Sequence, residues 1–127
     1  MIFTLRSPCP CCGRMVHEDR PGSYLICPVC FWEDDLLQLR WPHLDPGANK
    51  ISLIEAQRNF QKIGAKLIQR LELTRDPLDD EPIAEGFRII DLTIDNFEEV
   101  FVQEEPWPDD RSVLYWWLPT FWRRSKR

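Results

Sequence analysis

The sequence predicts a small α+β protein, in which a zinc-ribbon-like N-terminal segment packs on one amphipathic helix and a C-terminal half of short strands follows. Three observations predict this class: two Cys-x-x-Cys motifs near the N-terminus, helical periodicity over 53–72, and β-branched or aromatic runs at 87–94 and 112–118. A chain of 127 residues with 43% apolar content is enough for one modest core, so we expect a single domain.

The four outer cysteines of the two motifs predict a metal site. Cys9 pairs with Cys12 and Cys27 pairs with Cys30, and each spacing lets the chain turn so that two thiolates reach one ion. Two such turns complete a tetrahedral shell, for which Zn²⁺ is the natural occupant. We therefore expect one structural zinc ion on these four residues. Such a closed shell leaves no open position for catalysis.

The fifth cysteine, Cys11, lies between the ligands of the first motif and does not easily join the same ion. It is either a small buried hydrophobic residue or a redox or regulatory thiol. Nothing at the N-terminus reads as a secretion signal, and the longest apolar run, 113–118, is far below the length of a membrane span. We therefore expect a soluble, cytoplasmic protein that uses cysteines for metal binding rather than for disulfides.

The segment 53–72 predicts one long helix. Ser52 can cap its first turn, with Glu55 three residues later as the second half of a capping box. A single apolar stripe then recurs at steps of three and four: Leu53, Ala56, Phe60, Ile63, Leu67 and Leu71.

Other segments predict turns, connections and short strands. We expect a turn at 18–23, a short strand at 24–26, an irregular connection over 36–50, and strands at 87–94 and 112–118. Residues 95–101 fit either a short helix or a strand. Phe31 and Trp32, directly after the second motif, are expected to cover the metal site and keep water from the thiolates.

Several motifs in order resemble the bacterial cysteine-rich CPCC domain family over roughly residues 8–66. They are Cys9-Pro10-Cys11-Cys12-Gly13, Pro21 to Tyr24, Ile26 to Asp35, Gly47 to Lys50, Ser52 to Phe60, and Gly64-Ala65. The resemblance implies a small bacterial cytoplasmic protein. Domains of this kind also occur among the immunity proteins that accompany polymorphic toxins, so the resemblance implies that role for this chain.

Other polar groups allow two interpretations each. Glu33, Asp34, Asp35 and Asp45 are either an acid/base cluster or, as we favour, a solvated face or acceptors for loop amides. The two histidines, His17 and His43, have no spaced nucleophile or second ligand, which indicates ordinary loop residues. The aromatic residues near the C-terminus form either a binding patch or part of the core: Trp107, Trp116, Trp117, Phe121 and Trp122.

Charge points to the class of partner. The net charge is −5, and four of the 16 basic residues lie in the last five positions, so residues 1–122 carry 12 basic and 21 acidic groups, or −9. Such a body attracts basic partners and repels phosphate backbones.

We therefore expect a zinc-stabilised, non-enzymatic binding protein, with an immunity protein that neutralises a basic toxin as the leading hypothesis. Its contacts are expected from residues 76–122, beyond the family resemblance. The alternative is a nucleic-acid-associated zinc-ribbon adaptor that uses the basic cluster at 123–127, and an enzyme ranks third.

Overall fold

The computed structural model describes residues 6–124, which contain short regular elements joined by long loops. Strands β1 (Ser7–Pro8) and β2 (Met15–His17) pair antiparallel in a two-stranded sheet. Two α-helices follow, α1 (Leu36–Arg40) and α2 (Leu53–Ile63), with three 3₁₀ helices, η1 (Gly47–Asn49), η2 (Ile68–Leu73) and η3 (Arg111–Leu114). Helices and a small sheet are thus both present, but with far less strand than the sequence predicts.

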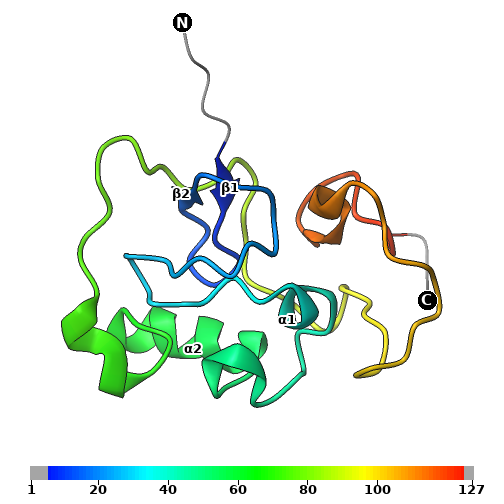
Figure 1. Ribbon diagram of the computed structural model, residues 1–127, viewed down its shortest axis with the longest axis horizontal. Helices are drawn as coiled ribbons and strands as arrows, with labels where there is room; N and C mark the ends of the chain where they lie inside the picture. Colours follow the sequence, from blue (N-terminus) through cyan, green and yellow to red (C-terminus); the bar gives the residue numbers. More distant parts are fainter. Residues whose placement is uncertain (1–5, 125–127) are drawn as a thin grey trace, which may run out of the picture.

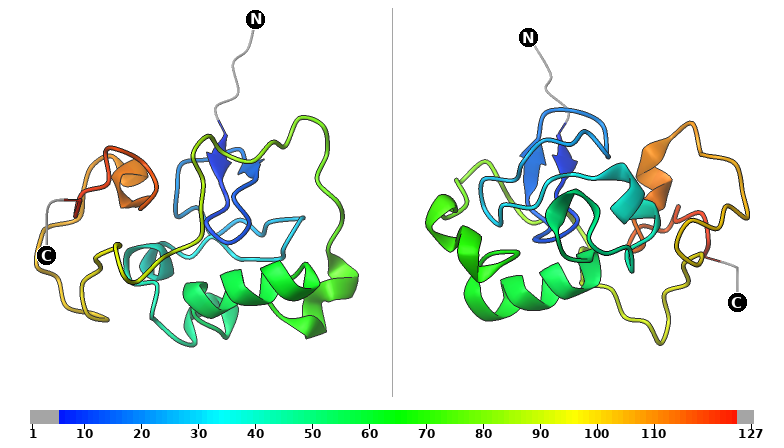
Figure 2. Two further views of the ribbon diagram at one scale, coloured as in Figure 1. Left: turned by 180° about the vertical axis from the view of Figure 1, so that it is seen from behind. Right: turned by 60° about the horizontal axis from the view of Figure 1, so that its bottom comes forward.

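The loops that carry the cysteines lie between the β1–β2 hairpin and helix α2 (Figure 1). The C-terminal part, with η3, lies at the opposite end of the molecule from η2, as the views from behind and from below also show (Figure 2). None of the helices within residues 6–124 is long and apolar enough to cross a membrane.

Helix α2 begins where the sequence predicts and ends nine residues earlier than predicted. The Ser52 hydroxyl accepts a hydrogen bond from the Glu55 amide at 3.2 Å, as in a capping box. At the other end, Gly64 has φ 85° and its amide donates to the Phe60 carbonyl at 2.9 Å. This left-handed glycine cap stops the helix, because it turns the chain out of the helical path. The predicted helix over 53–72 was therefore wrong beyond residue 63.

Helix α1 lies inside the segment 36–50, which was predicted to be irregular. The Asp35 carboxylate caps it by accepting from the amides of Leu37 at 2.8 Å and Gln38 at 3.3 Å. The same carboxylate accepts from Ala48 at 2.9 Å, at the start of η1. One buried aspartate thus organises both short helices of this segment.

The predicted strands outside the hairpin are not formed. Residues 24–26 make only an isolated bridge from Ile26 to Glu33, and Tyr24 has a left-handed φ of 64°. Residues 87–94 and 95–101 are turns and loops, and the segment 112–118 starts inside η3 and continues as turns.

Backbone groups of the C-terminal half find side-chain partners instead of a neighbouring strand. The Ile90 amide donates to Gln57 Oε1 at 3.0 Å, and the Arg88 carbonyl accepts from the Trp116 indole at 3.0 Å. Buried backbone groups need a partner of some kind, and here polar side chains supply it.

One hydrophobic cluster joins both halves of the chain. It contains all five cysteines and Trp32 from the N-terminal half together with Ile90, Leu114, Tyr115, Trp116, Trp117 and Phe121. Trp116 and Trp117 are both buried, with ring centroids 4.9 Å apart. The C-terminal aromatic residues are therefore mainly core.

An enclosed ion pair also connects the two halves. Arg40 of α1 donates to both carboxylate oxygens of Glu98, at 2.7 and 3.0 Å, and neither side chain is exposed. The Arg40 guanidinium also contacts three indole rings at 4.5 to 5.0 Å, those of Trp41, Trp107 and Trp122.

Candidate metal centre

The two cysteine motifs fold into matching turns. In the first, the Gly13 amide donates to the Cys9 carbonyl at 2.7 Å; in the second, the Phe31 amide donates to the Cys27 carbonyl at 2.8 Å. Both residues that close the turns have left-handed φ values, 81° at Gly13 and 69° at Phe31. The Val29 amide also donates to the Cys27 sulfur at 3.4 Å. Each turn therefore presents its two sulfurs on the same side.

The four predicted ligands lie together. Their sulfur atoms all lie within 4.8 Å of one another, and the four residues are buried. The Cys9 and Cys30 sulfurs are 3.5 Å apart, and the Cys12 and Cys27 sulfurs 3.7 Å. Four sulfurs at about 2.3 Å from a tetrahedral Zn²⁺ would be about 3.8 Å apart, so this donor set fits such an ion.

Without a cation these thiols could not all ionise. Burial raises the pKa of the Cys9 and Cys30 thiols well above the ordinary value. Hydrogen bonds from Cys12, and then from Cys30 and Cys9, lower the pKa of Cys27 instead. A divalent cation would permit the buried thiols to ionise, because a coordinating thiol is deprotonated.

Large side chains pack around the cysteine cluster. Trp32 and Phe31 were both predicted to cover the metal site, and Phe31 is less buried than Trp32. Trp32 is fully buried in the same cluster, whereas Phe31 is half-buried. The Phe31 ring lies 5.5 Å from the Lys66 ammonium, and Lys66 donates its amide to the Cys30 carbonyl at 2.9 Å. Cys11 is also fully buried, as a small apolar residue would be.

The acidic run that follows the second motif holds loops in place. Asp34 Oδ2 accepts from the amides of Gly22 and Ser23 at 3.0 Å, and from the Ser23 hydroxyl at 3.1 Å. Burial raises the pKa of Asp34, although nearby His17 and these hydrogen bonds oppose the shift. Together with the capping role of Asp35, this confirms acceptors for loop amides. Of the other two acids, Asp45 is exposed and Glu33 half-buried, so the four are not gathered in one environment.

The two histidines differ from each other. His43 is exposed in a loop, as predicted, but His17 lies in β2 and is 2% exposed. The prediction of an ordinary loop residue was wrong for His17, which the hairpin buries. Neither histidine belongs to the sulfur cluster.

A second polar network, which sequence reasoning missed, supports the loop after α1. Asn49 Oδ1 accepts from the Glu33 amide at 2.7 Å and from the Lys66 ammonium at 2.9 Å. Its Nδ2 donates to the Glu33 carbonyl and to Gln38 Oε1, both at 2.8 Å. Every polar atom of this fully buried amide is satisfied, which is typical of a residue that fixes one loop conformation.

The basic cluster at 123–127 is partly used inside the protein. Arg123 is 5% exposed and donates to Asn96 at 3.0 Å and Glu104 at 3.3 Å. Arg124 donates to the Trp116 and Leu118 carbonyls. Lys126 and Arg127 lie outside the described residues. Two of the four charges invoked for nucleic acid thus have internal partners.

Some acidic residues of the C-terminal half also have internal partners, whereas others lie on the surface. Glu98 and Glu81 are buried. Glu98 pairs with Arg40, and Glu81 accepts two hydrogen bonds from Arg75 at 2.7 and 2.9 Å. Exposed acidic side chains remain at Asp79, Asp80, Glu99, Glu104, Asp109 and Asp110.

Comparison with known families agrees with this geometry. A family model described as "Cysteine-rich CPCC" matches residues 7–81, which is more than half of the chain and extends beyond the resemblance noted over 8–66. No curated protein matches the sequence. The matched region contains both cysteine turns, α1, α2 and the Asn49 network, whereas residues 82–124 lie outside it.

Proposed function

Because this chain belongs to the cysteine-rich CPCC family, we propose that it is a zinc-stabilised binding protein without enzymatic activity, and more specifically an immunity protein that neutralises a bacterial toxin. Zinc acts here as a structural ion. Four buried thiolates from two turns fill a tetrahedral shell and leave no position for a substrate or a reactive water. Metal binding would contribute directly to folding, because the unfolded chain has no preformed site.

The observation that carries the binding role is a set of unpaired acidic groups near the end of the family match and beyond it. Asp79, Glu99 and Asp109 are exposed, and their carboxylates make no hydrogen bond or ion pair within residues 6–124. Two of the three follow residue 81, where the match ends. Unpaired surface carboxylates attract basic proteins over a Debye length, so they favour a basic partner.

An exposed apolar tip lies next to one of these acids. Phe101 is 63% exposed and Val102 43% exposed, two and three positions after Glu99. Phe101 has a left-handed φ of 63°, and its ring contacts Trp41 edge-on at 5.5 Å. An aromatic side chain held at a loop tip beside a charge is a candidate anchor for a protein partner. This residue takes the place of the predicted aromatic anchors, which are largely buried.

Co-expression with the product of the adjacent upstream gene tests the proposal. That product should arrest growth alone, and this chain should restore growth and copurify with it. Glu99→Lys and Phe101→Ala should each weaken the complex at least tenfold by calorimetry. Glu72→Lys, a change at an exposed acid on η2, is the matched control and should bind normally. A harmless upstream product would remove the basis of the immunity role.

A further inference from the structure

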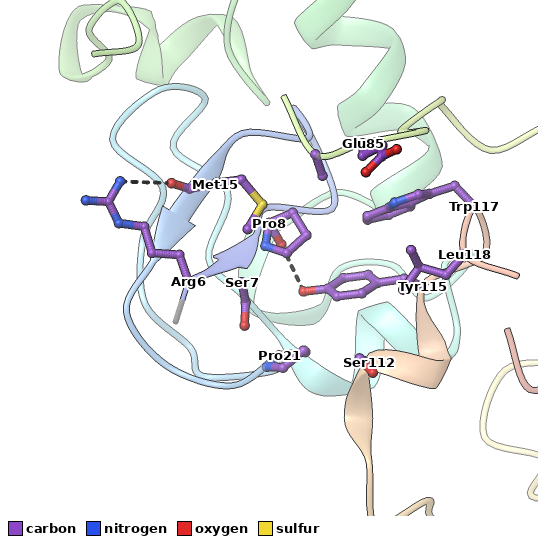
Figure 3. A pocket seen from close by; sticks show the side chains of 11 residues that line it. Arg6, Ser7, Pro8, Met15, Pro21, Glu85, Ser112, Tyr115, Trp117 and Leu118 are labelled. Atoms are coloured by element: carbon purple, nitrogen blue, oxygen red, sulfur yellow. Dashed lines mark hydrogen bonds between the residues drawn. The ribbon is translucent and has the colours of Figure 1, made fainter. Parts of the chain in front are cut away.

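An apolar recess lies between the β1–β2 hairpin and the C-terminal segment. It has a volume of about 300 Å³. Its walls come from segments far apart in the sequence and include Pro8, Met15, Pro21, Tyr115, Trp117 and Leu118 (Figure 3). This volume lies at the lower end of ligand pockets, and the mainly apolar lining is typical of them.

Contacts between residues of the protein itself fix the shape of the pocket. The Tyr115 hydroxyl donates to the Pro8 carbonyl at 2.9 Å, as Figure 3 shows. The Tyr115 and Trp117 rings lie 4.6 Å apart with an interplanar angle of 31°. The Pro21 carbonyl accepts from Arg111 at 3.2 Å. Contacts within the fold thus hold the aromatic wall of the pocket in place.

Two residues that line this pocket carry polar groups without a partner in residues 6–124. Glu85 is exposed, lines the pocket, and makes no hydrogen bond or ion pair within residues 6–124. Glu85 and Trp117 both line this pocket, as Figure 3 shows. Trp117 is 8% exposed, and its Nε1 also has no hydrogen-bond partner among the described residues. An apolar recess with an unpaired carboxylate in its lining suits a ligand that has both an apolar part and a charged or polar part.

The other charge at the pocket is already compensated. Arg6 donates to the Asp80 carboxylate at 3.0 Å, to the Asp80 carbonyl at 2.6 Å and to the Met15 carbonyl at 3.4 Å. Its guanidinium points away from the recess in Figure 3. Of the two charged residues that line the pocket, Glu85 is therefore the one without a partner in residues 6–124, and its carboxylate favours a cation.

We propose that this pocket receives a lysine or arginine side chain of the partner protein, with its methylene stem on the apolar floor and its cationic head at Glu85. Long basic side chains combine such a stem with a charged end. A cation beside the Trp117 ring also gains a cation–π contact. A purely apolar occupant would instead desolvate the carboxylate without pairing it, which is unfavourable.

This inference rests on the proposed role as a binder of a basic protein, but its first test does not need that partner. The probe is n-butylammonium, which reproduces a lysine side chain, and 1-butanol is the neutral control. The readout is the Trp117 indole ¹H–¹⁵N resonance, assigned through Trp117→Phe. Butylammonium should shift this resonance selectively and saturably, and 1-butanol should bind at least fivefold more weakly. No shift, or equal binding of both probes, would overturn the proposal.

Two variants connect the probe with the partner. Glu85→Gln should weaken butylammonium binding at least fivefold without changing that of 1-butanol, and Glu72→Gln should change neither. Glu85→Gln should also weaken the toxin complex in the growth assay. Unchanged probe affinity in Glu85→Gln refutes the pocket even if the wild-type protein protects. An intact probe response in a wild-type protein that does not protect supports the pocket and overturns the immunity role instead.

Discussion

Removing the negative charge of Glu98 should destabilise the folded protein by about 3 kcal/mol. Glu98→Gln keeps the size of the side chain but leaves the Arg40 guanidinium buried without its counter-ion. Breaking a buried pair by removing one partner costs about 3–5 kcal/mol. We expect the lower end, because Arg40 still donates to the Glu105 carbonyl at 2.7 Å and contacts three indole rings.

Urea unfolding followed by tryptophan fluorescence measures this loss. Free Zn²⁺ must be held constant, because a ligand that binds only the native state adds to its stability. With an m-value of about 1.5 kcal/mol per M, a loss of 3 kcal/mol lowers the midpoint by about 2 M. Glu99→Gln, at the exposed neighbouring position, is the control and should change stability by less than about 0.5 kcal/mol.

Two results would contradict this energetic role of the Arg40–Glu98 pair. A loss below about 1 kcal/mol in Glu98→Gln would place the pair among weak surface ion pairs. In a double-mutant cycle, Arg40→Met with Glu98→Leu should lose less than the sum of the two single changes, because neither charge is then left unpaired. Simple additivity would contradict an energetic connection between the two side chains.

The same pair has a signature in pH. Burial raises the pKa of Glu98, but hydrogen bonds from Arg40 and from the Glu104 amide outweigh it, so the net pKa lies below the ordinary range. A lowered carboxyl pKa stabilises the fold above the unfolded value of about 4.3, and this contribution is lost as the pH falls through the folded value. The stability gap between wild type and Glu98→Gln should therefore shrink in acid.

Three further predictions concern single residues. Gly13→Ala should cost about 2 kcal/mol or more in thermal unfolding, because its Cβ would lie 2.4 Å from the Phe87 ring; Gly86→Ala, with a similar φ and open space, should lose only about 1 kcal/mol, and equal losses would disprove the clash. Gln57→Leu should cost about 2–4 kcal/mol of folding stability, because the buried Ile90 amide and the Pro10 carbonyl lose their side-chain partner. Unaltered hydrogen exchange at the Ile90 amide would argue against this. Hydrogen bonds from its arginine partner lower the pKa of Glu81 to about 2, so wild-type stability should fall between about pH 4 and pH 2, and Glu81→Gln should fall less; parallel curves would contradict the pairing.

The cysteine site could be predicted because its information is local. Each turn needs only five consecutive residues, and the bond from the Gly13 amide to the Cys9 carbonyl closes the first without help from the rest of the chain. The end of α2 was also readable, since Gly64 is a strong helix stop that the apolar periodicity concealed. The cap of α1 by Asp35 was another local signal.

The C-terminal half could not be predicted from local patterns. Its β-branched run over 87–94 pairs with no strand in residues 6–124, and the Ile90 amide binds a side chain 33 positions earlier in the chain. The hydroxyl of Tyr115 binds the Pro8 carbonyl across 107 positions. Such partners depend on the complete fold, whereas β propensity describes only a tendency to fit a sheet.

Metal content is the most direct test of the central claim, a closed four-cysteine zinc centre that stabilises a binding protein. Purified protein should contain about one zinc ion per chain by elemental analysis, and chelation should unfold it. Cys27→Ser should lose both the metal and the fold, whereas Cys11→Ser should keep both, because Cys11 is outside the set of four. A metal-free protein that is folded, or a Cys27→Ser variant that retains zinc and native stability, would contradict the account.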